Sequence, residues 1–365
     1  MNIEEIIEKS RPADNSRYLG WVCSYTPEEL LLAAGFTPYR LLTTADLSSG
    51  SEAYLAPNLC PYVHRLFAAG LEGKYDFLDA VAFVYSCDAM RRLADMWDLY
   101  LDLGPVYTLD VPRRRDRYAK EYFRTNLLEF KDKLETLAGR QIRDEDLANA
   151  ISIVNKTRRL MQEIYDLRSE NPGLVSGRDV LELARTSSTA DREKFNHYLE
   201  EFVRELSLQN RNNPGNPGKK RIMLYGNAVE EESIYTIVEQ AGGEVVWDDH
   251  CLSARHFDTP VDEAMDPWQA IADRYLQKSS CPRMQGMEER INRILQNIYT
   301  YNCAGVIIHS LKFCDLMQSE IPRLVKALQD RQIEHLHVER ENLAEDPGQI
   351  KTRIEAFMEL LGKKQ

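Results

Sequence analysis

The stretch VAFVYSCDAMRR, residues 81–92, is the part of the sequence that decides the fold. A continuous apolar run comes just before Cys87, and a polar stretch follows, which is typical of a buried strand that leads into a helix. The same order returns in GVIIHSLKFCD, residues 305–315, where the cysteine is Cys314. The two copies indicate that one supersecondary unit occurs twice in the chain.

Strand and helix patterns alternate on both sides of these two copies. Short apolar runs lie at residues 18–23, 39–42, 80–85 and 106–109, and again at 221–225, 245–247, 306–308 and 336–338. Continuous apolar strands separated by helices predict parallel sheets that are covered on both faces. We therefore expect an α/β fold with two Rossmann-like parallel-sheet domains, related by internal duplication, and a helical insert.

The domain limits follow from changes in pattern along the chain. We expect a first α/β domain at residues 1–112, a helical insert at 113–210, a linker at 211–220 and a second α/β domain at 221–365. Apolar residues at three- and four-residue spacing mark the insert as helical, most clearly over 118–137 and 144–170. The linker is the polar, Pro- and Gly-rich stretch that ends the insert.

Composition excludes some classes of function. The chain has 365 residues and a formal charge of −12, which argues against nucleic acid or an anionic membrane surface as a partner. The acidic first 16 residues do not have the pattern of a signal peptide, and no apolar stretch reaches the roughly 18 residues that cross a bilayer. We expect a cytoplasmic protein. In that compartment cysteines serve metals or catalysis more often than disulfides.

Cysteines recur at matching places in the two halves of the chain. The first half holds Cys23, Cys60 and Cys87, and the second half holds Cys251, Cys281 and Cys314. Cys60-Pro61 and Cys281-Pro282 each predict the start of a helix. The other four follow apolar runs, at the carboxyl ends of strands where α/β sheets bind ligands. Cys303 has no counterpart and is interpreted as a small buried hydrophobe.

Six thiols placed in this way predict ligands of an iron–sulfur cluster. Zinc is the alternative, but structural zinc sites typically use closely spaced pairs such as CxxC, and the sequence has none. A helix that begins at a cysteine favours the thiolate form and an anionic cluster, because its amino end carries partial positive charge.

The motifs GWVCSYTPEELLLAAGFTPYRLL, NLCPYVHR, SCDAMRRL, HSLKFCD and GQIKTRIEAFMELL resemble the catalytic subunits of the 2-hydroxyacyl-CoA dehydratase and benzoyl-CoA reductase family. The resemblance extends from about residue 18 to residue 361. It implies a low-potential cluster on Cys60, Cys87 and Cys314, reduced by a separate homodimeric activator that hydrolyses ATP and carries its own [4Fe-4S] cluster. ATP would be bound by that partner, and this chain has no GxxxxGK[ST] loop.

One branch of this family carries a double-cubane [8Fe-9S] cluster, which needs six thiolates, and the six cysteines fit that branch best. The resemblance then implies an oxygen-sensitive oxidoreductase that reduces a small molecule and forms a homodimer. The alternative is a heterodimeric subunit of a 2-hydroxyacyl-CoA dehydratase, a lyase, or of a benzoyl-CoA reductase, with one [4Fe-4S] cluster and ketyl radical chemistry on an acyl-CoA. From another class, a metal-free two-lobed protein that binds a small ligand stays open.

Four further residues are candidates for catalysis. His64 and His309 lie near proposed ligands and could deliver protons, or could be hydrogen-bonded residues that pack the cleft. Glu28 could act as a general base, although acidic residues are favourable in a first helical turn in any case. Ser24 could line the substrate pocket. The lone Gly226 after its strand is no dinucleotide fingerprint, so NAD and FAD are not expected.

Overall fold

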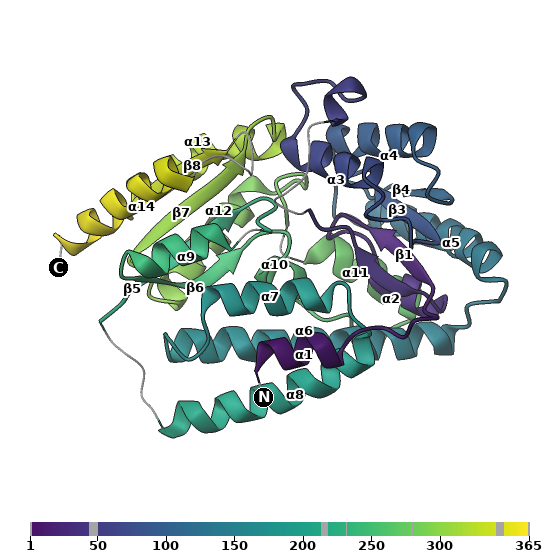
Figure 1. Cartoon of the computed structure of the whole chain (residues 1–365), viewed down its shortest axis with the longest axis horizontal. Helices are drawn as coiled ribbons and strands as arrows, with labels where there is room; N and C mark the ends of the chain where they lie inside the picture. Colours follow the sequence, from purple (N-terminus) through teal and green to yellow (C-terminus); the bar gives the residue numbers. More distant parts are fainter. Residues whose placement is uncertain are drawn as a thin grey trace.

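The computed structural model shows two parallel sheets that face one another across the middle of the molecule (Figure 1). It describes residues 2–43, 50–212, 218–230, 232–278, 280–340 and 347–363. In these residues the strands form two four-stranded sheets with the orders β2-β1-β3-β4 and β6-β5-β7-β8. The two orders are equivalent, so the predicted α/β fold with two duplicated parallel sheets is confirmed.

The first sheet consists of β1 (Tyr18–Trp21), β2 (Thr37–Arg40), β3 (Ala80–Val84) and β4 (Val106–Leu109). The helices that accompany it are α1 (Ile3–Lys9), α2 (Glu28–Ala33), α3 (Pro61–Leu71) and α4 (Asp88–Tyr100), with a 3₁₀ turn at Ser51–Ala53. All five residues of β3 are buried, because this strand has neighbours on both sides and helices on both faces.

The second sheet consists of β5 (Lys220–Gly226), β6 (Gly243–Asp249), β7 (Gly305–Leu311) and β8 (His335–Arg340). Its helices are α9 (Ser233–Gln240), α10 (Ala254–Phe257), α11 (Pro267–Gln277), α12 (Met287–Thr300), α13 (Asp315–Gln329) and α14 (Pro347–Gly362). Strand β7 corresponds to β3 and is buried along its whole length.

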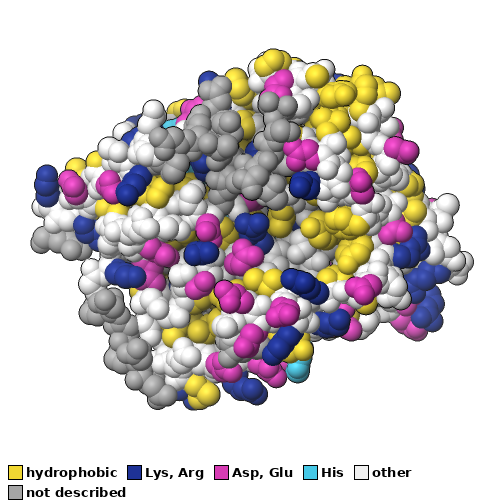
Figure 2. All heavy atoms as spheres, in the orientation of Figure 1, with side chains coloured by type: hydrophobic (Ala, Val, Ile, Leu, Met, Phe, Trp, Pro, Cys, Tyr) yellow, Lys and Arg dark blue, Asp and Glu magenta, His cyan; other side chains and the backbone are white. Residues whose placement is uncertain are grey.

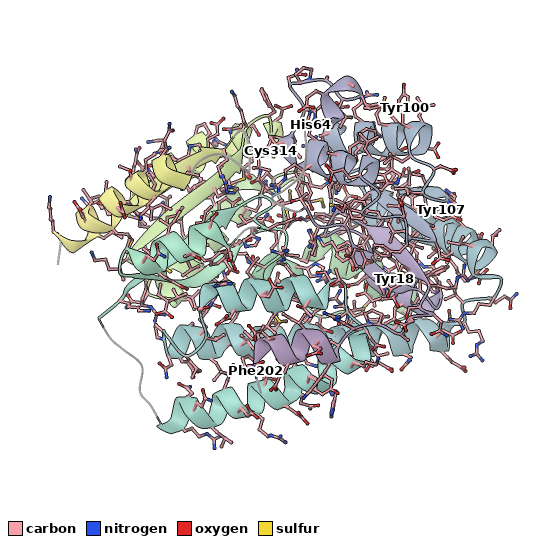
Figure 3. All side chains as sticks on the ribbon, viewed as in Figure 1. Tyr18, His64, Tyr100, Tyr107, Phe202 and Cys314 are labelled. Atoms are coloured by element: carbon pink, nitrogen blue, oxygen red, sulfur yellow. The ribbon has the colours of Figure 1, made fainter. Side chains whose placement is uncertain are left out.

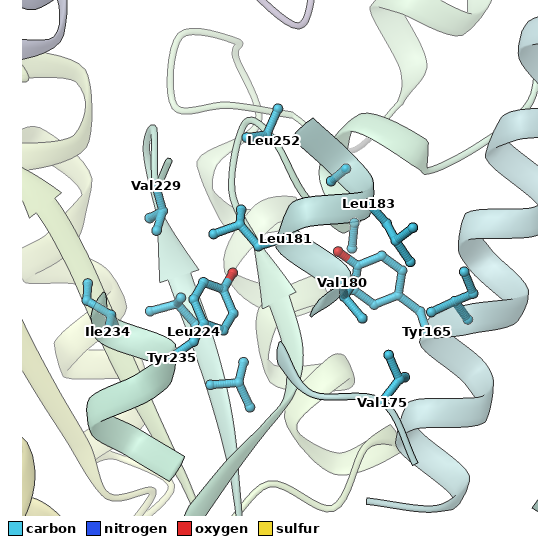
Figure 4. Packing of buried hydrophobic residues seen from close by; sticks show 14 of the residues in the cluster. Tyr165, Val175, Val180, Leu181, Leu183, Leu224, Val229, Ile234, Tyr235 and Leu252 are labelled. Carbon is cyan, nitrogen blue, oxygen red and sulfur yellow. The ribbon is translucent and has the colours of Figure 1, made fainter. Parts of the chain in front are cut away.

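The middle of the chain forms a helical layer beneath both sheets, seen along the lower part of Figure 1. It comprises α6 (Asp144–Glu170), α7 (Gly177–Ser187) and α8 (Arg192–Asn212), whereas α5 (Arg117–Ala138) packs against β4 and α11. Helix α6 packs against α2 of the first unit and β6 of the second. Figure 4 shows part of the core that results, where Tyr165 of α6 and Val180 of α7 pack with Leu224 of β5.

The cores cross the predicted domain limits. Residues of α11, including Trp268, Ile271 and Tyr275, pack with Leu19 and Trp21 of the first sheet. Helix α1 packs on α7 and α8, so the start of the chain lies against the helical layer. One core, from Met223 to Leu328, however lies wholly within the predicted second domain, and the limits at residues 112, 210 and 220 stay a prediction from sequence pattern.

One predicted helix start is wrong. Cys281-Pro282 begins a turn between α11 and α12, in which the Met284 amide donates to the Cys281 carbonyl oxygen at 3.0 Å. Helix α12 begins only after Gly286, whose φ of +96° suits glycine. In the predicted linker, α8 extends to residue 212, β5 begins at residue 220, and residues 213–217 lie outside the described part of the chain.

Acidic and basic side chains are interspersed on the face of the molecule drawn in Figure 2, which also shows apolar side chains gathered over the first unit. In the part of the chain that the structure describes, no helix is both long enough and apolar enough to cross a membrane.

Candidate functional site

All six cysteines of the predicted set line one cavity between the two sheets. Its volume is about 110 Å³, and we refer to it as the cysteine cavity. The six come from both halves of the chain: Cys23, Cys60, Cys87, Cys251, Cys281 and Cys314. Figure 3 shows Cys314 in the middle of the molecule, at the side of the second unit that faces the first. Cys303 does not line this cavity.

Three of these cysteines, which we call the outer triad, each precede a helix. Cys60 is the N-cap residue of α3, Cys87 of α4 and Cys314 of α13. Backbone N–H groups of the first helical turn lower the pKa of each thiol, for example that of Met90 at Cys87, although burial outweighs them. Three helix amino ends therefore converge on the outer triad, and their partial positive charge favours thiolates.

The other three cysteines, the inner triad, lie in loops. Cys23 follows β1, Cys251 follows β6 and Cys281 lies in the turn before α12. Positively charged side chains surround them. The Arg40 guanidinium donates to the Cys251 carbonyl oxygen at 2.9 Å, and the charges of Lys278 and Arg255 act on Cys251. Side-chain cations thus surround the inner triad, in which the backbone N–H of Arg283 also acts on Cys281, whereas three helix amino ends lie at the outer triad.

The thiols influence one another both within and between the two triads: Cys23 acts on Cys87, and Cys251 acts on Cys314. Burial, followed by the neighbouring thiols of Cys314 and Cys87, raises the pKa of Cys60 well above its ordinary value. Burial and then Cys251 raise the pKa of Cys281 to about 12. Burial also raises the pKa of Cys87 to about 11. Without a metal the thiols of Cys60, Cys87 and Cys281 are protonated at neutral pH, so metal binding would release protons.

The donor set fits an iron–sulfur cluster. Six soft sulfur ligands suit iron–sulfur chemistry, and hydrogen bonds to the sulfurs are among the features that tune such clusters. Within the described residues, no group of three His, Cys, Asp or Glu side chains is arranged to hold a single metal ion.

A second, wider pocket opens beside the outer triad. Its volume is about 700 Å³, and Cys60, Cys87 and Cys314 are the cysteines that line it. We call it the open pocket. Charged and polar side chains form much of its wall: Asp88, Arg91, Asp110, Arg113, Tyr122, Arg283 and Asp315. The outer triad therefore lies between the cysteine cavity and a space large enough for a small molecule.

The match between the two halves is incomplete, which corrects the sequence prediction. Cys87 and Cys314 are equivalent, because they follow the equivalent strands β3 and β7. Cys23, however, follows β1, and Cys251 follows β6, which is the counterpart of β2. Cys23 lies two residues after β1, and the position two residues after β5 is Ala228, which also lines the cysteine cavity. The two units therefore share their strand order, but the positions of the inner triad do not repeat between them.

Two candidate catalytic residues lie at or near the cavity. Ser24 lines it and is buried. Glu28 is buried behind it, with a carboxylate oxygen 2.5 Å from the Arg192 guanidinium and another 3.3 Å from His256. Burial opposes ionisation of Glu28, yet the Arg192 charge holds its pKa well below the ordinary value. A carboxylate so stabilised is a weak base, so its proposed role as a general base gains no support.

Neither candidate histidine lines either of the two spaces. His64 lies on α3 (Figure 3), where its ring pairs with Ser51 Oγ at 2.9 Å and with the Ala56 carbonyl oxygen at 3.1 Å. His309 lies buried on β7, and neither of its ring nitrogens has a hydrogen-bond partner among the described residues. Burial lowers the pKa of His309 to about 3, so it is neutral at physiological pH. Their proton-delivery roles stay predictions.

Sequence reasoning missed part of the cavity wall. Arg40, Tyr62, Asn227 and Arg283 contribute to it, although they are distant in sequence from most of the cysteines. Two of them carried a signal. Arg283 follows Cys281-Pro282 directly, and Asn227 follows Gly226 at the end of a predicted strand. Arg40 had none, because only the fold brings the end of β2 to Cys251.

The sequence profile of the family described as 2-hydroxyglutaryl-CoA dehydratase, D-component (HGD-D), matches residues 23–361, which include all six cysteines. The chain belongs to this family. The family contains subunits of benzoyl-CoA reductase and of 2-hydroxyacyl-CoA dehydratases, and its members are enzyme components. The predicted resemblance is therefore confirmed.

Individual relatives are similar along nearly their whole length. The chain is 28% identical over 352 residues to a benzoyl-CoA reductase subunit of Thauera aromatica, covering 93% of this chain and 89% of that protein. It is 24% identical to the (R)-phenyllactyl-CoA dehydratase beta subunit of Clostridium sporogenes, covering 99% and 96%. It is 25% identical to the beta subunit of (R)-2-hydroxyglutaryl-CoA dehydratase of Acidaminococcus fermentans, covering 96% and 93%.

Proposed function

We propose that this chain is the iron–sulfur component of a low-potential reductase and holds a double-cubane [8Fe-9S] cluster on its outer and inner triads. The observation that supports this most strongly is that six cysteines from both halves line one cavity in two groups of three. A single cubane with three protein thiolates would use one triad and leave three thiols of the same cavity without a role.

The cluster, when bound, supplies electrons at low potential. The chain's own residues hold and shield it. The helix amino ends at Cys60, Cys87 and Cys314 place backbone N–H groups near these thiols, and Arg40 and Arg283 bring positive charge to the cavity wall. The open pocket would receive a small-molecule substrate next to the outer triad, and Ser24 remains the candidate to contact it from the cavity side.

Electrons would come from a separate homodimeric activator that hydrolyses ATP and carries its own [4Fe-4S] cluster. The supporting facts are the family membership and the naming of the relatives as subunits of larger enzymes. We also propose a cytoplasmic, oxygen-sensitive homodimer that matches the two-fold symmetry of this activator. The activator's ATPase activity, measured with and without this chain, tests the partnership.

The test of the cluster is the content of iron and acid-labile sulfide per chain, after purification without oxygen. About eight irons are expected for the double cubane, and about four would show a single cubane. No iron after anaerobic reconstitution would contradict both forms of the cluster and favour a metal-free protein that binds a small ligand. Ultraviolet–visible and electron paramagnetic resonance spectra of the same sample show whether the iron is present as a cluster.

A second candidate function is supported by the open pocket, which the outer triad alone among the cysteines lines. In that case the chain is one subunit of a 2-hydroxyacyl-CoA dehydratase or a benzoyl-CoA reductase, with one [4Fe-4S] cluster on Cys60, Cys87 and Cys314. Such an enzyme would carry a second, related subunit. Purification from the native host distinguishes the two: a homodimer supports the first proposal, and a related chain in equal amount supports the second.

A further inference from the structure

Lys278 is a buried lysine at the edge of the cysteine cavity wall. It lies at the end of α11, is 1% exposed, and its ammonium group makes no hydrogen bond to any residue that the structure describes. The ammonium lies 4.7 Å from the centre of the Tyr25 ring, and Tyr25 lines the cysteine cavity. The hydroxyl of the same tyrosine accepts from the Cys281 amide at 3.4 Å. Lys278 therefore lies behind the inner triad.

Three buried carboxylates are paired with cations other than Lys278. Glu28 pairs with Arg192, and Glu29 pairs with Arg158 at 2.6 Å. Asp249 pairs with Arg255 at 2.6 Å. In the part of the chain that is described, Lys278 and Arg40 form no ion pair with a carboxylate, and the positive charges of Arg274 and Arg255 act on Lys278.

The negative groups left for this ammonium are the sulfurs of the inner triad. Burial, followed by the charge of Arg274, lowers the pKa of Lys278 to about 7, and the charges of Cys23 and Cys251 oppose this shift and favour the charged form. A buried charge without a counter-charge costs several kcal/mol, so a surplus of buried cations indicates that an anion belongs beside them. Thiolates bound to a cluster would be that anion.

We propose that Lys278 is a positioning residue for the inner half of the cluster, where its ammonium balances the negative charge on Cys23 and Cys251 and raises the midpoint potential of that half above that of the outer half. This inference rests on the proposed double cubane. The physical reason is that a nearby fixed positive charge favours the more negative, reduced state, and cluster potentials respond to local charge. The outer triad receives backbone amides and no buried lysine.

The test is a redox titration of anaerobically purified Lys278→Met, followed by electron paramagnetic resonance. Methionine keeps the length and apolar stem of the side chain and removes the charge. One of two reduction steps is expected to move to a more negative potential while the other keeps its wild-type value. Lys326→Met is the matched control, since Lys326 is exposed and pairs with Asp330 on α13. Unchanged steps, or equal shifts of both steps, would overturn the inference.

A second measurement separates this role from a merely structural one. In loaded protein, Lys278→Met is expected to lose iron to a chelator several-fold faster than wild type. In cluster-free protein the same variant is expected to be as stable as wild type or more stable against heat, because an unpaired buried charge has been removed. A variant that is less stable in both forms would contradict the proposal.

The iron content of the wild-type protein distinguishes failure of the double-cubane proposal from failure of the role proposed for Lys278. About eight irons with no effect of Lys278→Met would overturn the role of Lys278 alone. About four irons, all on the outer triad, would overturn both the double cubane and the balancing role.

Discussion

The outer and inner triads differ in the groups that stabilise a negative charge on their sulfurs. In the outer triad each cysteine begins a helix, so the groups that stabilise a thiolate are backbone amides with fixed positions. In the inner triad the cysteines lie in loops, and buried side chains such as Arg40 and Lys278 supply the positive charge. Backbone stabilisation persists through most substitutions, whereas side-chain stabilisation depends on a few residues. We therefore expect the inner triad to be the more easily altered half.

The largest expected effect comes from removing one ligand of each triad. Cys281→Ser is expected to lose about half of the iron, because the double cubane would keep the half on the outer triad. Cys87→Ser is expected to lose the half beside the open pocket and with it the catalytic activity. Iron and sulfide per chain are the measurement. Cys303→Ser is the matched control, since Cys303 lies outside the cavity. An intact cluster in Cys281→Ser would show that the inner triad binds no iron.

The next effect concerns the scaffold behind the inner triad. Arg158 of α6 and Glu29 of α2 form an ion pair at 2.6 Å that is 1% and 0% exposed, and Tyr275 donates to the same carboxylate at 2.8 Å. Arg158→Met leaves a buried carboxylate unpaired and is expected to lower the free energy of unfolding by about 3–5 kcal/mol. Urea denaturation of the cluster-free protein measures it.

The counterpart near the outer triad is the exposed pair of Arg92 and Asp88 at 3.5 Å on α4. Arg92→Met is expected to change the free energy of unfolding by less than about 1 kcal/mol, because solvent screens this pair. Equal losses of unfolding free energy in Arg92→Met and Arg158→Met would show that burial does not determine how much each ion pair contributes to stability.

Acid is expected to weaken the same scaffold. The pKa of Glu28 is held below its ordinary value of 4.5 by Arg192, despite burial. Its stabilising contribution is therefore complete above about pH 4.5 and is lost as the pH falls through the lowered folded-state pKa. Wild type should lose stability over this range, and Glu28→Gln should lose less. Unfolding curves between pH 3 and 7 test this, with exposed Glu4→Gln as the control. Parallel curves for Glu28→Gln and wild type would contradict the expected linkage.

The smallest expected effect is in the outer triad. Burial is the main cause of the raised pKa of Cys314, and the neighbouring Asp315 carboxylate adds to it. Asp315→Asn removes one charge, an interaction of about 1 kcal/mol in water, so alkylation of Cys314 in cluster-free protein should be a few-fold faster. Mass spectrometry of the labelled peptides reports Cys314 and Cys281 separately. An equal change at Cys281 would indicate a general loosening of the cavity.

The spacing of apolar residues within single segments was sufficient to predict the strands, the long helices and the two sheets. Strand β4 and helix α6 have the predicted bounds, residues 106–109 and 144–170, because apolar spacing within one segment determines them. The convergence of the cysteines also followed, since parallel strands of two facing sheets bring their carboxyl ends together.

The turn at Cys281 could not be predicted in this way. It is held by Arg283, which donates to the carbonyl oxygens of Ser86 at 3.1 Å and Val111 at 2.5 Å, both in the first unit. The sequence of residues 279–286 contains no signal that predicts the contacts with Ser86 and Val111. The burial of Lys278 was equally hidden, because a lysine in the last turn of a helix is usually exposed. Both features arise from packing between segments that are far apart in sequence.

The packing of α11 into the first sheet has a consequence for how the protein is made. The strands of that sheet leave the ribosome early, but Trp268, Ile271 and Tyr275, which complete its core, are translated much later. A nascent chain must keep apolar surface of the first sheet uncovered until most of the second unit has emerged. The cysteine cavity also closes only then, since Cys281 and Cys314 follow α11. Insertion of the proposed cluster would therefore act on a nearly finished polypeptide and not on a growing one.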